Sequence, residues 1–422
     1  MRAIAIVVFL AGCGGESTPD PDMTCGNGDV DPDEICDGET VACNSLGAAW
    51  ASGNASCKAS CGGWDTSTCV ADASGAFESV KPAERDPAQF ETARCNDGTP
   101  FSFRVSLAPQ PSAIWMIHLQ GGGFCDDKAR SCATREMNLK TTSPLADRTL
   151  RSGDLHGIMS RSPTVNPTFA NVNLVAAQYC SSDFWTGTTT ERRPTLGDPV
   201  NGWYFSGRAN VAALLAMLAQ RYGLDDQNPS LEVLWTGDSA GAHGAHFNFD
   251  QAARALPQTL AGKRVWYLAD AGWMIDWDDP AARIVNTTVP DREVWRAALA
   301  LWGGALDPNC EAASADQIDC WFGPGWYPHI SARAPVFIQQ SSIDSVIGIE
   351  LHGLMPSPTA MKWRQQVLAS FAPVTWLFSG GTAYHVLTID DLPFSNMGPD
   401  GFKLNQMVGR FFEDRAPERV VF

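Results

Sequence analysis

Apolar residues occur along this chain in short, nearly continuous runs, separated by longer segments of mixed polarity. Short apolar runs bounded by polar turns are typical of strands buried on both faces of a sheet. They predict strands at residues 113–119, 171–178, 231–236, 265–271, 336–340 and 374–378. Between them, residues 209–222 (ANVAALLAMLAQRY) repeat apolar positions every three or four residues and stop at Gly223, as helices do. Strands that alternate with helices predict an α/β fold with a mostly parallel sheet and helices on both faces.

The pattern at the beginning of the chain is different. Residues 1–12 contain Arg2 and then an apolar stretch too short to cross a bilayer, which predicts a signal peptide. Residues 10–13 (Leu-Ala-Gly-Cys) resemble a bacterial lipobox, so we expect lipidation at Cys13 and export as a bacterial lipoprotein. The alternative is an ordinary signal peptide with a chance cysteine. Residues 13–24 read as a tether, and no later apolar run reaches the ~18 residues of a spanning helix. Membrane contact is therefore expected only through the lipidated N-terminus. We expect the protein to lie at the cell envelope or outer membrane, with extracellular release as the alternative.

Twelve cysteines follow Cys13, an even number that predicts disulfides in an exported chain. Residues 25–72 hold six of them and few large apolar residues, which predicts a small disulfide-rich module ahead of a catalytic domain at 79–422. The segment CGNGDVDPDEICDGE resembles a cysteine-rich repeat of exported bacterial proteins.

Charge and metal-ligand patterns narrow the range of partners. The net charge of −17 argues against binding nucleic acid. Asp29, Asp31 and Asp33 alternate as in a calcium loop, but Glu34 and Thr40 stand where that loop needs a glycine and a bidentate glutamate. No histidine lies nearby to favour zinc. We therefore expect no metal and no cofactor.

A candidate nucleophile follows the predicted strand 231–236. Gly237-Asp238-Ser239-Ala240-Gly241 fits the pattern G-x-S-x-G between a strand and a helix. The glycines permit a sharp turn, and the helix N-terminus stabilises negative charge beside the serine oxygen. The alternative is a serine that only caps the helix. The context predicts that Ser239 is a nucleophile.

Such a serine needs a histidine base, and the base needs a carboxylate to orient it. In α/β-hydrolases the chain order is serine, acid, histidine, each after a strand. His385 follows the predicted strand 374–378 and is the favoured base, with His329 and His352 as weaker candidates. Asp344 follows the predicted strand 336–340 and is the favoured acid, with Asp270 as the alternative.

The oxyanion that forms during acyl transfer needs backbone N–H donors. Ala240 follows the serine, and Gly121-Gly122-Gly123 directly follows the predicted strand 113–119. The glycines lack the following lysine and hydroxyl of a phosphate-binding loop. We expect oxyanion donors among Gly122, Gly123 and Ala240.

Several segments together resemble the pectin acetylesterase and Notum family of serine hydrolases. They are HLQGGGFC with CATRE (118–125 and 132–136), YCSSDFWTG (179–187), GDSAGAHG (237–244), SSIDSV (341–346), AYHVL (383–387) and CNDGTPF (95–101). The resemblance covers residues 90–410, and YCSSD is its most specific segment. The family's glutamate before the glycines is Gln120 here, its tryptophan after them is Phe124, and Ala242 stands where it often has glycine.

The resemblance implies an α/β-hydrolase fold and a serine carboxylesterase without a metal, with Ser239, Asp344 and His385 as the catalytic triad. It suggests disulfides Cys125–Cys132, Cys310–Cys320 and Cys95–Cys180. It implies substrate contacts by Gln120, Phe124, Asp183 and Trp185, although Asp183 and Trp185 could instead brace the oxyanion loop.

The family members divide by substrate. For an anchored bacterial protein we expect a monomer that removes O-acetyl groups from a polysaccharide such as pectin. The alternatives are a Notum-like esterase for fatty-acyl groups or polyesters, and a catalytically inactive carbohydrate-binding protein of the cell surface.

Overall fold

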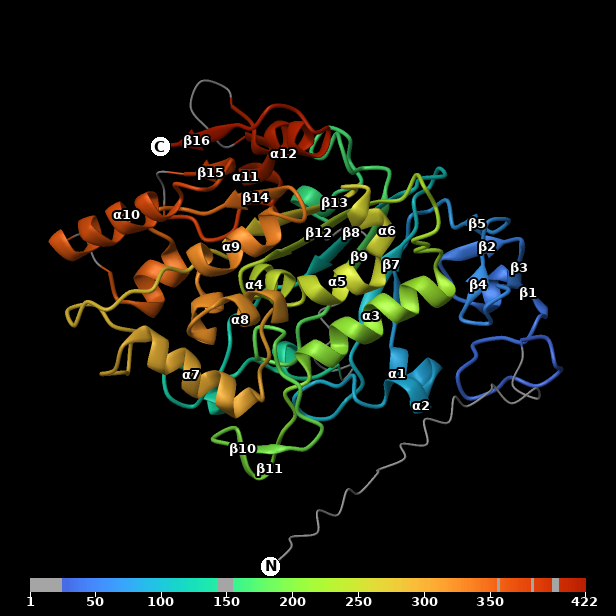
Figure 1. The fold of residues 1–422 in the computed structure, drawn as a ribbon, viewed down its shortest axis with the longest axis horizontal. Coiled ribbons are helices and arrows are strands. Elements are labelled where there is room, and N and C mark those ends of the chain that lie inside the picture. Colours follow the sequence, from blue (N-terminus) through green and yellow to red (C-terminus); the bar gives the residue numbers. More distant parts are fainter. Residues whose placement is uncertain (1–24, 143–154, 355–356, 381–382, 397–401) are drawn as a thin grey trace, which may run out of the picture.

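The computed structural model describes residues 25–142, 155–354, 357–380, 383–396 and 402–422, with a nine-stranded sheet at its centre (Figure 1). The strand order is β16-β15-β14-β13-β12-β8-β9-β7-β6. The strands span Glu78–Val80 (β6), Phe103–Ser106 (β7), Ile114–Leu119 (β8), Asn173–Ala177 (β9), Glu232–Asp238 (β12), Val265–Asp270 (β13), Val336–Gln339 (β14), Trp376–Ser379 (β15) and Arg419–Val421 (β16). The neighbours from β9 to β16 pair in parallel, whereas β7 pairs antiparallel with β6 and β9.

The predicted mostly parallel sheet is confirmed. The six predicted strands correspond to β8, β9, β12, β13, β14 and β15, with ends displaced by two residues at most. The sequence pattern did not predict β6, β7 and β16, which are short strands at or near the two edges.

Alternate residues of the central strands enter two separate hydrophobic cores, as the period of two in a strand requires. On β12, Val233 and Trp235 face the larger core while Leu234 faces the smaller one. Helices α3 (Gly207–Arg221), α4 (Ala240–Phe247) and α9 (Gly323–Ser331) cover the first face, and α12 (Leu404–Phe412) covers the second (Figure 1). The predicted helix at 209–222 is α3. The site residues at the ends of β12, β13 and β14 are therefore carried by strands fixed from both sides.

Further helices surround this layered centre. They are α1 (Pro82–Arg85), α2 (Pro87–Phe90), α5 (Phe249–Ala255), α6 (Pro257–Ala261), α7 (Asp291–Trp302), α8 (Pro308–Ala313), α10 (Pro358–Ser370) and α11 (Asp391–Asn396). A two-stranded hairpin of β10 (Arg193–Thr195) and β11 (Asp198–Trp203) projects from the body of the molecule (Figure 1).

The cysteine-rich segment forms two small sheets, β1-β3-β4 and β2-β5, closed by the disulfides Cys25–Cys61, Cys36–Cys57 and Cys43–Cys69. Its strands are β1 (Thr40–Ala42), β2 (Trp50–Ser52), β3 (Asn54–Cys57), β4 (Trp64–Asp65) and β5 (Val70–Ala71). The segment packs against the end of α3 (Figure 1), where the indole of Trp50 donates to the carbonyl of Arg221 at 3.1 Å. The division into a module at 25–72 and a catalytic domain at 79–422 stays a prediction.

The other six cysteines pair as Cys95–Cys180, Cys125–Cys132 and Cys310–Cys320, the pairs that the resemblance suggests. The predicted signal peptide, Cys13 and the tether lie outside the described residues. Among the residues that are described, no helix is both long and apolar enough to cross a membrane.

Candidate active site

Ser239 stands at the sharp turn between β12 and α4. Its backbone has φ = 52° and ψ = −124°, a conformation that is costly for a residue with a side chain. The turn packs tightly against β8, because a Cβ atom added to Gly241 would lie 1.8 Å from the carbonyl oxygen of Leu119. Only glycine permits this approach of helix and strand, which lifts the serine above the carboxyl edge of the sheet.

A continuous series of hydrogen bonds joins the three residues of the predicted triad. Nε2 of His385 lies 2.7 Å from Oγ of Ser239, and Nδ1 lies 2.7 and 2.8 Å from the two carboxylate oxygens of Asp344. Asp344 is buried, and it caps the π-helical turn Ser345–Leu351 by accepting from the backbone N–H of Val346 and Ile347. Fixed in this way, the carboxylate can hold the imidazole with Nε2 toward the serine.

The charge state of His385 is set by two opposing effects. Burial lowers its pKa, but the adjacent Asp344 carboxylate raises it by its charge and its hydrogen bond, and the net pKa lies above the ordinary value. A buried base with a raised pKa can take a proton from a hydroxyl and keep it while a negative charge forms nearby.

Asp270, the alternative acid, does not bond to the imidazole. It lies fully buried at the end of β13, and its carboxylate accepts from the backbone N–H groups of Leu387 and Thr388 and from the hydroxyl of Thr388, at 2.5 to 3.2 Å. Burial raises its pKa to about 6. Asp270 therefore anchors the segment that directly follows His385.

The glycine loop after β8 lies against the serine turn. A Cβ atom on Gly121 would lie 2.9 Å from Cβ of Ser239, and Gly122 and Gly123 have φ values of 140° and 68° that favour glycine. Within the described part of the chain, no acceptor takes a hydrogen bond from the backbone N–H of Gly122, Gly123 or Ala240. These N–H groups are available to a ligand beside Ser239.

A cavity of about 640 Å³ contains Ser239, His385, Gly122 and Gly123 in its lining. Its apolar lining comprises Phe124, Ala129, Leu139, Phe184, Ala271, Met274, Val346, Ile347, Leu351 and Val386, and its polar lining includes Arg130, Ser131, Thr134, Arg135, Glu136, Asn286 and Glu350. This volume lies within the range of sites for small organic ligands.

One side of the cavity ends at a wall of packed rings. The centroids of Phe124 and Phe184 are 5.2 Å apart, and Phe184 lies 5.1 Å from His243 and 5.2 Å from Trp321. Burial lowers the pKa of His243 to about 3, so its imidazole is neutral and behaves as part of this wall.

Of the predicted substrate contacts, only Phe124 lines the cavity. Trp185 and Asp183 are completely buried, and Gln120 accepts at 3.2 Å from the backbone N–H of Tyr179. Asp183 accepts from the N–H groups of Trp185, Gly187 and Gly207 and from the hydroxyl of Ser181, and burial raises its pKa to about 6. Neither side chain lines the cavity, which favours the bracing role of Asp183 and Trp185 over direct substrate contact.

The sequence reasoning did not single out two polar contacts of the glycine loop. Asp238 accepts from Gly121 N–H at 3.0 Å and bonds to the buried His118 at 2.8 Å. Arg135 donates to the carbonyl of Gly122 at 2.6 Å. The signal for Arg135 was present in CATRE, but a motif letter does not say which atom it contacts.

Groups of three or more potential metal ligands occur, in the described residues, only around Cys25, Cys57 and Cys61 and around Glu34, Asp37 and Cys61. Their cysteines are bonded in disulfides and so offer no thiolate. These groups do not fit a thiolate metal centre.

The chain is similar to several known proteins. A model of the pectinacetylesterase family matches residues 79–369. The palmitoleoyl-protein carboxylesterase Notum of Drosophila melanogaster is 32% identical over 284 residues, which is 64% of this chain and 39% of that protein. The human protein of the same name is 30% identical over 257 residues, 59% of this chain and 48% of that protein. The chain thus spans less than half of the length of these curated relatives.

Two crystal structures of the Wnt deacylase Notum from Drosophila resemble most of this fold. Their TM-scores are 0.65 and 0.66 at 26% and 25% identity, and the match covers 78% and 82% of this chain and 94% and 96% of those chains. This likeness and the sheet topology together identify an α/β-hydrolase fold.

Proposed function

Because this chain belongs to the pectinacetylesterase family, we propose that it is a serine carboxylesterase that removes O-acetyl groups from a polysaccharide. The observation that carries the proposal is the series of hydrogen bonds from Ser239 through His385 to Asp344, with both His385 contacts near 2.7 Å. A dead hydrolase domain that only binds carbohydrate has no need for this alignment.

The reaction proceeds in two steps. His385 takes the proton of Ser239 as the oxygen attacks the ester carbonyl, and Asp344 stabilises the imidazolium that forms. The protonated imidazole then gives its proton to the departing alcohol, which leaves an acyl-enzyme. Water, activated by the same histidine, releases the acid and restores the serine.

The negative charge on the carbonyl oxygen forms beside the glycine loop. The free N–H groups of Gly122, Gly123 and Ala240 are the proposed donors to it. Removing one such donor typically costs ~3 to 4 kcal/mol of transition-state stabilisation.

The lining of the cavity favours a small acyl group on a hydroxyl-rich alcohol. The packed rings of Phe124 and Phe184 belong to its apolar lining, and Arg130, Ser131 and Glu350 belong to its polar lining. The apolar groups suit acetate, and the polar groups offer hydrogen bonds to sugar hydroxyls.

A second candidate is hydrolysis of a fatty-acyl ester. It is favoured by the names of the relatives, palmitoleoyl-protein carboxylesterase and Wnt deacylase, and by a cavity larger than acetate needs.

Cellular context completes the proposal. The six disulfides of the described residues suit an oxidising compartment, in agreement with export and the expected lipid anchor at Cys13. All the proposed site residues come from one chain, so we propose that the monomer is active. No cofactor takes part.

The test is hydrolysis of p-nitrophenyl esters from acetate to palmitate by residues 25–422 and by Ser239→Ala. We expect fast cleavage of acetate, a decline with acyl length and no cleavage by the variant. A maximum at long chains would select the fatty-acyl candidate. Equal activity of the two proteins, or none in either, would refute the serine mechanism.

A further inference from the structure

The guanidinium of Arg135 is held between the glycine loop and the YCSSD segment. Arg135 follows the Cys125–Cys132 disulfide, in the turn after the 3₁₀ helix Cys132–Thr134. Its Nη1 donates to the carbonyl oxygen of Gly122 at 2.6 Å, and its Nε donates to the hydroxyl of Ser182 at 2.8 Å. The proposed mechanism gives this partly buried cation no role.

The contact with Gly122 fixes the direction of the next N–H group. The Gly122 carbonyl and the Gly123 N–H belong to one peptide group, and the described chain contains no cis peptide bond. In a trans peptide these two bonds point in opposite directions. A guanidinium that holds the carbonyl oxygen therefore also sets where the Gly123 N–H points.

We propose that Arg135 is a positioning residue for the oxyanion site, which holds and polarises the Gly122–Gly123 peptide so that Gly123 N–H donates to the substrate oxyanion. Such a support is needed because Gly122 and Gly123 have no Cβ atom and can adopt many backbone conformations besides the positive φ values that they have here. The positive charge on the carbonyl side draws electron density from the peptide and strengthens the N–H as a donor.

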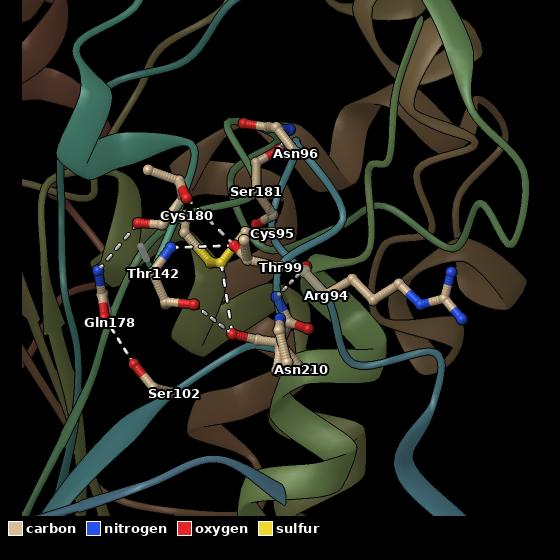
Figure 2. Close-up of a disulfide and its surroundings, with 12 residues drawn as sticks. Arg94, Cys95, Asn96, Thr99, Ser102, Thr142, Gln178, Cys180, Ser181 and Asn210 are labelled. Carbon is tan, nitrogen blue, oxygen red and sulfur yellow. Dashed lines mark hydrogen bonds between the residues drawn. A yellow bond between two sulfur atoms is a disulfide. The ribbon is translucent and has the colours of Figure 1, made fainter. Parts of the chain in front are cut away.

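The support for Arg135 extends to a disulfide. The hydroxyl of Ser182 bonds to Oδ1 of Asn96 at 2.6 Å, and the side-chain amide of Asn96 donates to the carbonyl of Ser181 at 2.8 Å. Figure 2 shows Asn96 and Ser181 beside the Cys95–Cys180 disulfide, whose two cysteines directly precede them in the sequence. The family segments CNDG and YCSSD thus meet behind Arg135 and limit its movement.

A competing role for Arg135 is direct substrate binding. The residue lines the cavity, and its buried Nη2 has no hydrogen-bond partner among the described residues. The two roles differ in kinetics: loss of a substrate contact raises KM, whereas loss of an oxyanion donor lowers kcat.

The experiment compares Arg135→Met and Arg135→Lys with the matched control Arg161→Met. Arg161 is also partly buried and donates to the backbone carbonyls of Ala170 and Val172, but it does not line the cavity. Each protein is assayed with p-nitrophenyl acetate and with the matching thionoester, in which sulfur replaces the carbonyl oxygen. Sulfur is a weak hydrogen-bond acceptor, so the thionoester depends less on the oxyanion donors. Thermal unfolding is measured in parallel.

For Arg135→Met we expect kcat on the oxoester to fall about tenfold to hundredfold, less than for complete removal of a donor, with KM nearly unchanged. The oxoester-to-thionoester ratio should fall by a similar factor, and Arg135→Lys should recover part of it. Arg161→Met should lose thermal stability but keep the wild-type ratio.

A wild-type ratio in both Arg135 variants, or a change in KM alone, would overturn the proposal. Should Arg135→Met fail to fold, the ratio of Arg135→Lys decides. The inference rests on the proposed function, and the two failures are distinguishable: an inactive wild-type protein refutes both, whereas an active wild type with unchanged variants refutes only the role of Arg135.

Discussion

Replacing Asp270 by asparagine changes one oxygen of a fully buried carboxylate to an amide. Among the described residues, the carboxylate accepts from two backbone N–H groups, those of Leu387 and Thr388, and from the hydroxyl of Thr388. In Asp270→Asn one of these donors must face the new NH₂ group. We expect the segment after His385 to shift, and kcat to fall, because the imidazole no longer lies in line with the serine.

The same substitution has a pH-dependent effect on stability. Burial raises the pKa of Asp270 from 3.8 to about 6 in the folded protein, so the folded state binds the proton more tightly than the unfolded state. A group of this kind stabilises the fold fully below pH 3.8, and that stabilisation is lost as the pH rises through about 6. At 1.36 kcal/mol per pKa unit, the change amounts to about 3 kcal/mol.

The assay is urea unfolding of wild type and Asp270→Asn between about pH 4 and about pH 7. The free energy of unfolding of the wild type, minus that of the variant, should fall by about 2 kcal/mol across this range, because asparagine does not titrate and pH 4 already lies just above the unfolded pKa of 3.8. Asp316→Asn is the control. Its hydrogen bonds to Arg292 and Arg296 lower the pKa of Asp316 to about 2, so its difference should stay nearly flat above pH 4. A flat difference for Asp270→Asn as well would refute the reasoning.

Three further outcomes follow from the site. Because the pKa of His385 is raised, kcat/KM should increase with pH through a midpoint above 6.5, and a pH profile that declines over this range would contradict a neutral base. Asp344→Asn should keep the fold but lower kcat by about 10⁴-fold, since the amide favours the wrong tautomer of the imidazole; steady-state kinetics measure this, and a loss below tenfold would argue against an orienting carboxylate. Gly241→Ala should give no soluble folded enzyme, because the new methyl group meets the carbonyl of Leu119 at 1.8 Å, and a normally active variant would show that the turn can relax.

The sequence predicted best what depends on local pattern. Buried strands such as β12 and β13 are nearly continuous apolar runs, and such short runs are typical of parallel strands buried on both faces. The edge strand β6 was missed because its three residues, Glu78 to Val80, alternate in burial and include an acid. The buried Glu78 carboxylate accepts from Arg85 and from the backbone N–H of Ala49 in the cysteine-rich segment, and no local pattern can show the contact with Ala49.

For the site, chain order selected Ser239, Asp344 and His385, and hydrogen bonds join these three residues in the structure. Chain order could not distinguish residues that contact a ligand from residues that hold the contacting residues in place. Asp183 and Trp185 lie in the most specific family segment, yet both are in the core. A specific motif shows that a side chain has contacts that other residue types cannot make. A buried carboxylate that accepts several hydrogen bonds meets this description as well as a residue that contacts substrate.

The buried acids show how this fold positions its site. Asp183 and Asp270 both have a pKa raised to about 6, and each holds several backbone N–H groups of a loop at the carboxyl edge of the sheet. Above pH 6 both are charged in the core, which costs folding energy, but a charged carboxylate binds N–H groups more tightly than a neutral one. The loop that carries His385 thus gains rigidity at the pH at which a neutral imidazole is needed. The raised pKa values are therefore a consequence of fixing the loops from inside the protein, where water cannot compete for the same N–H groups.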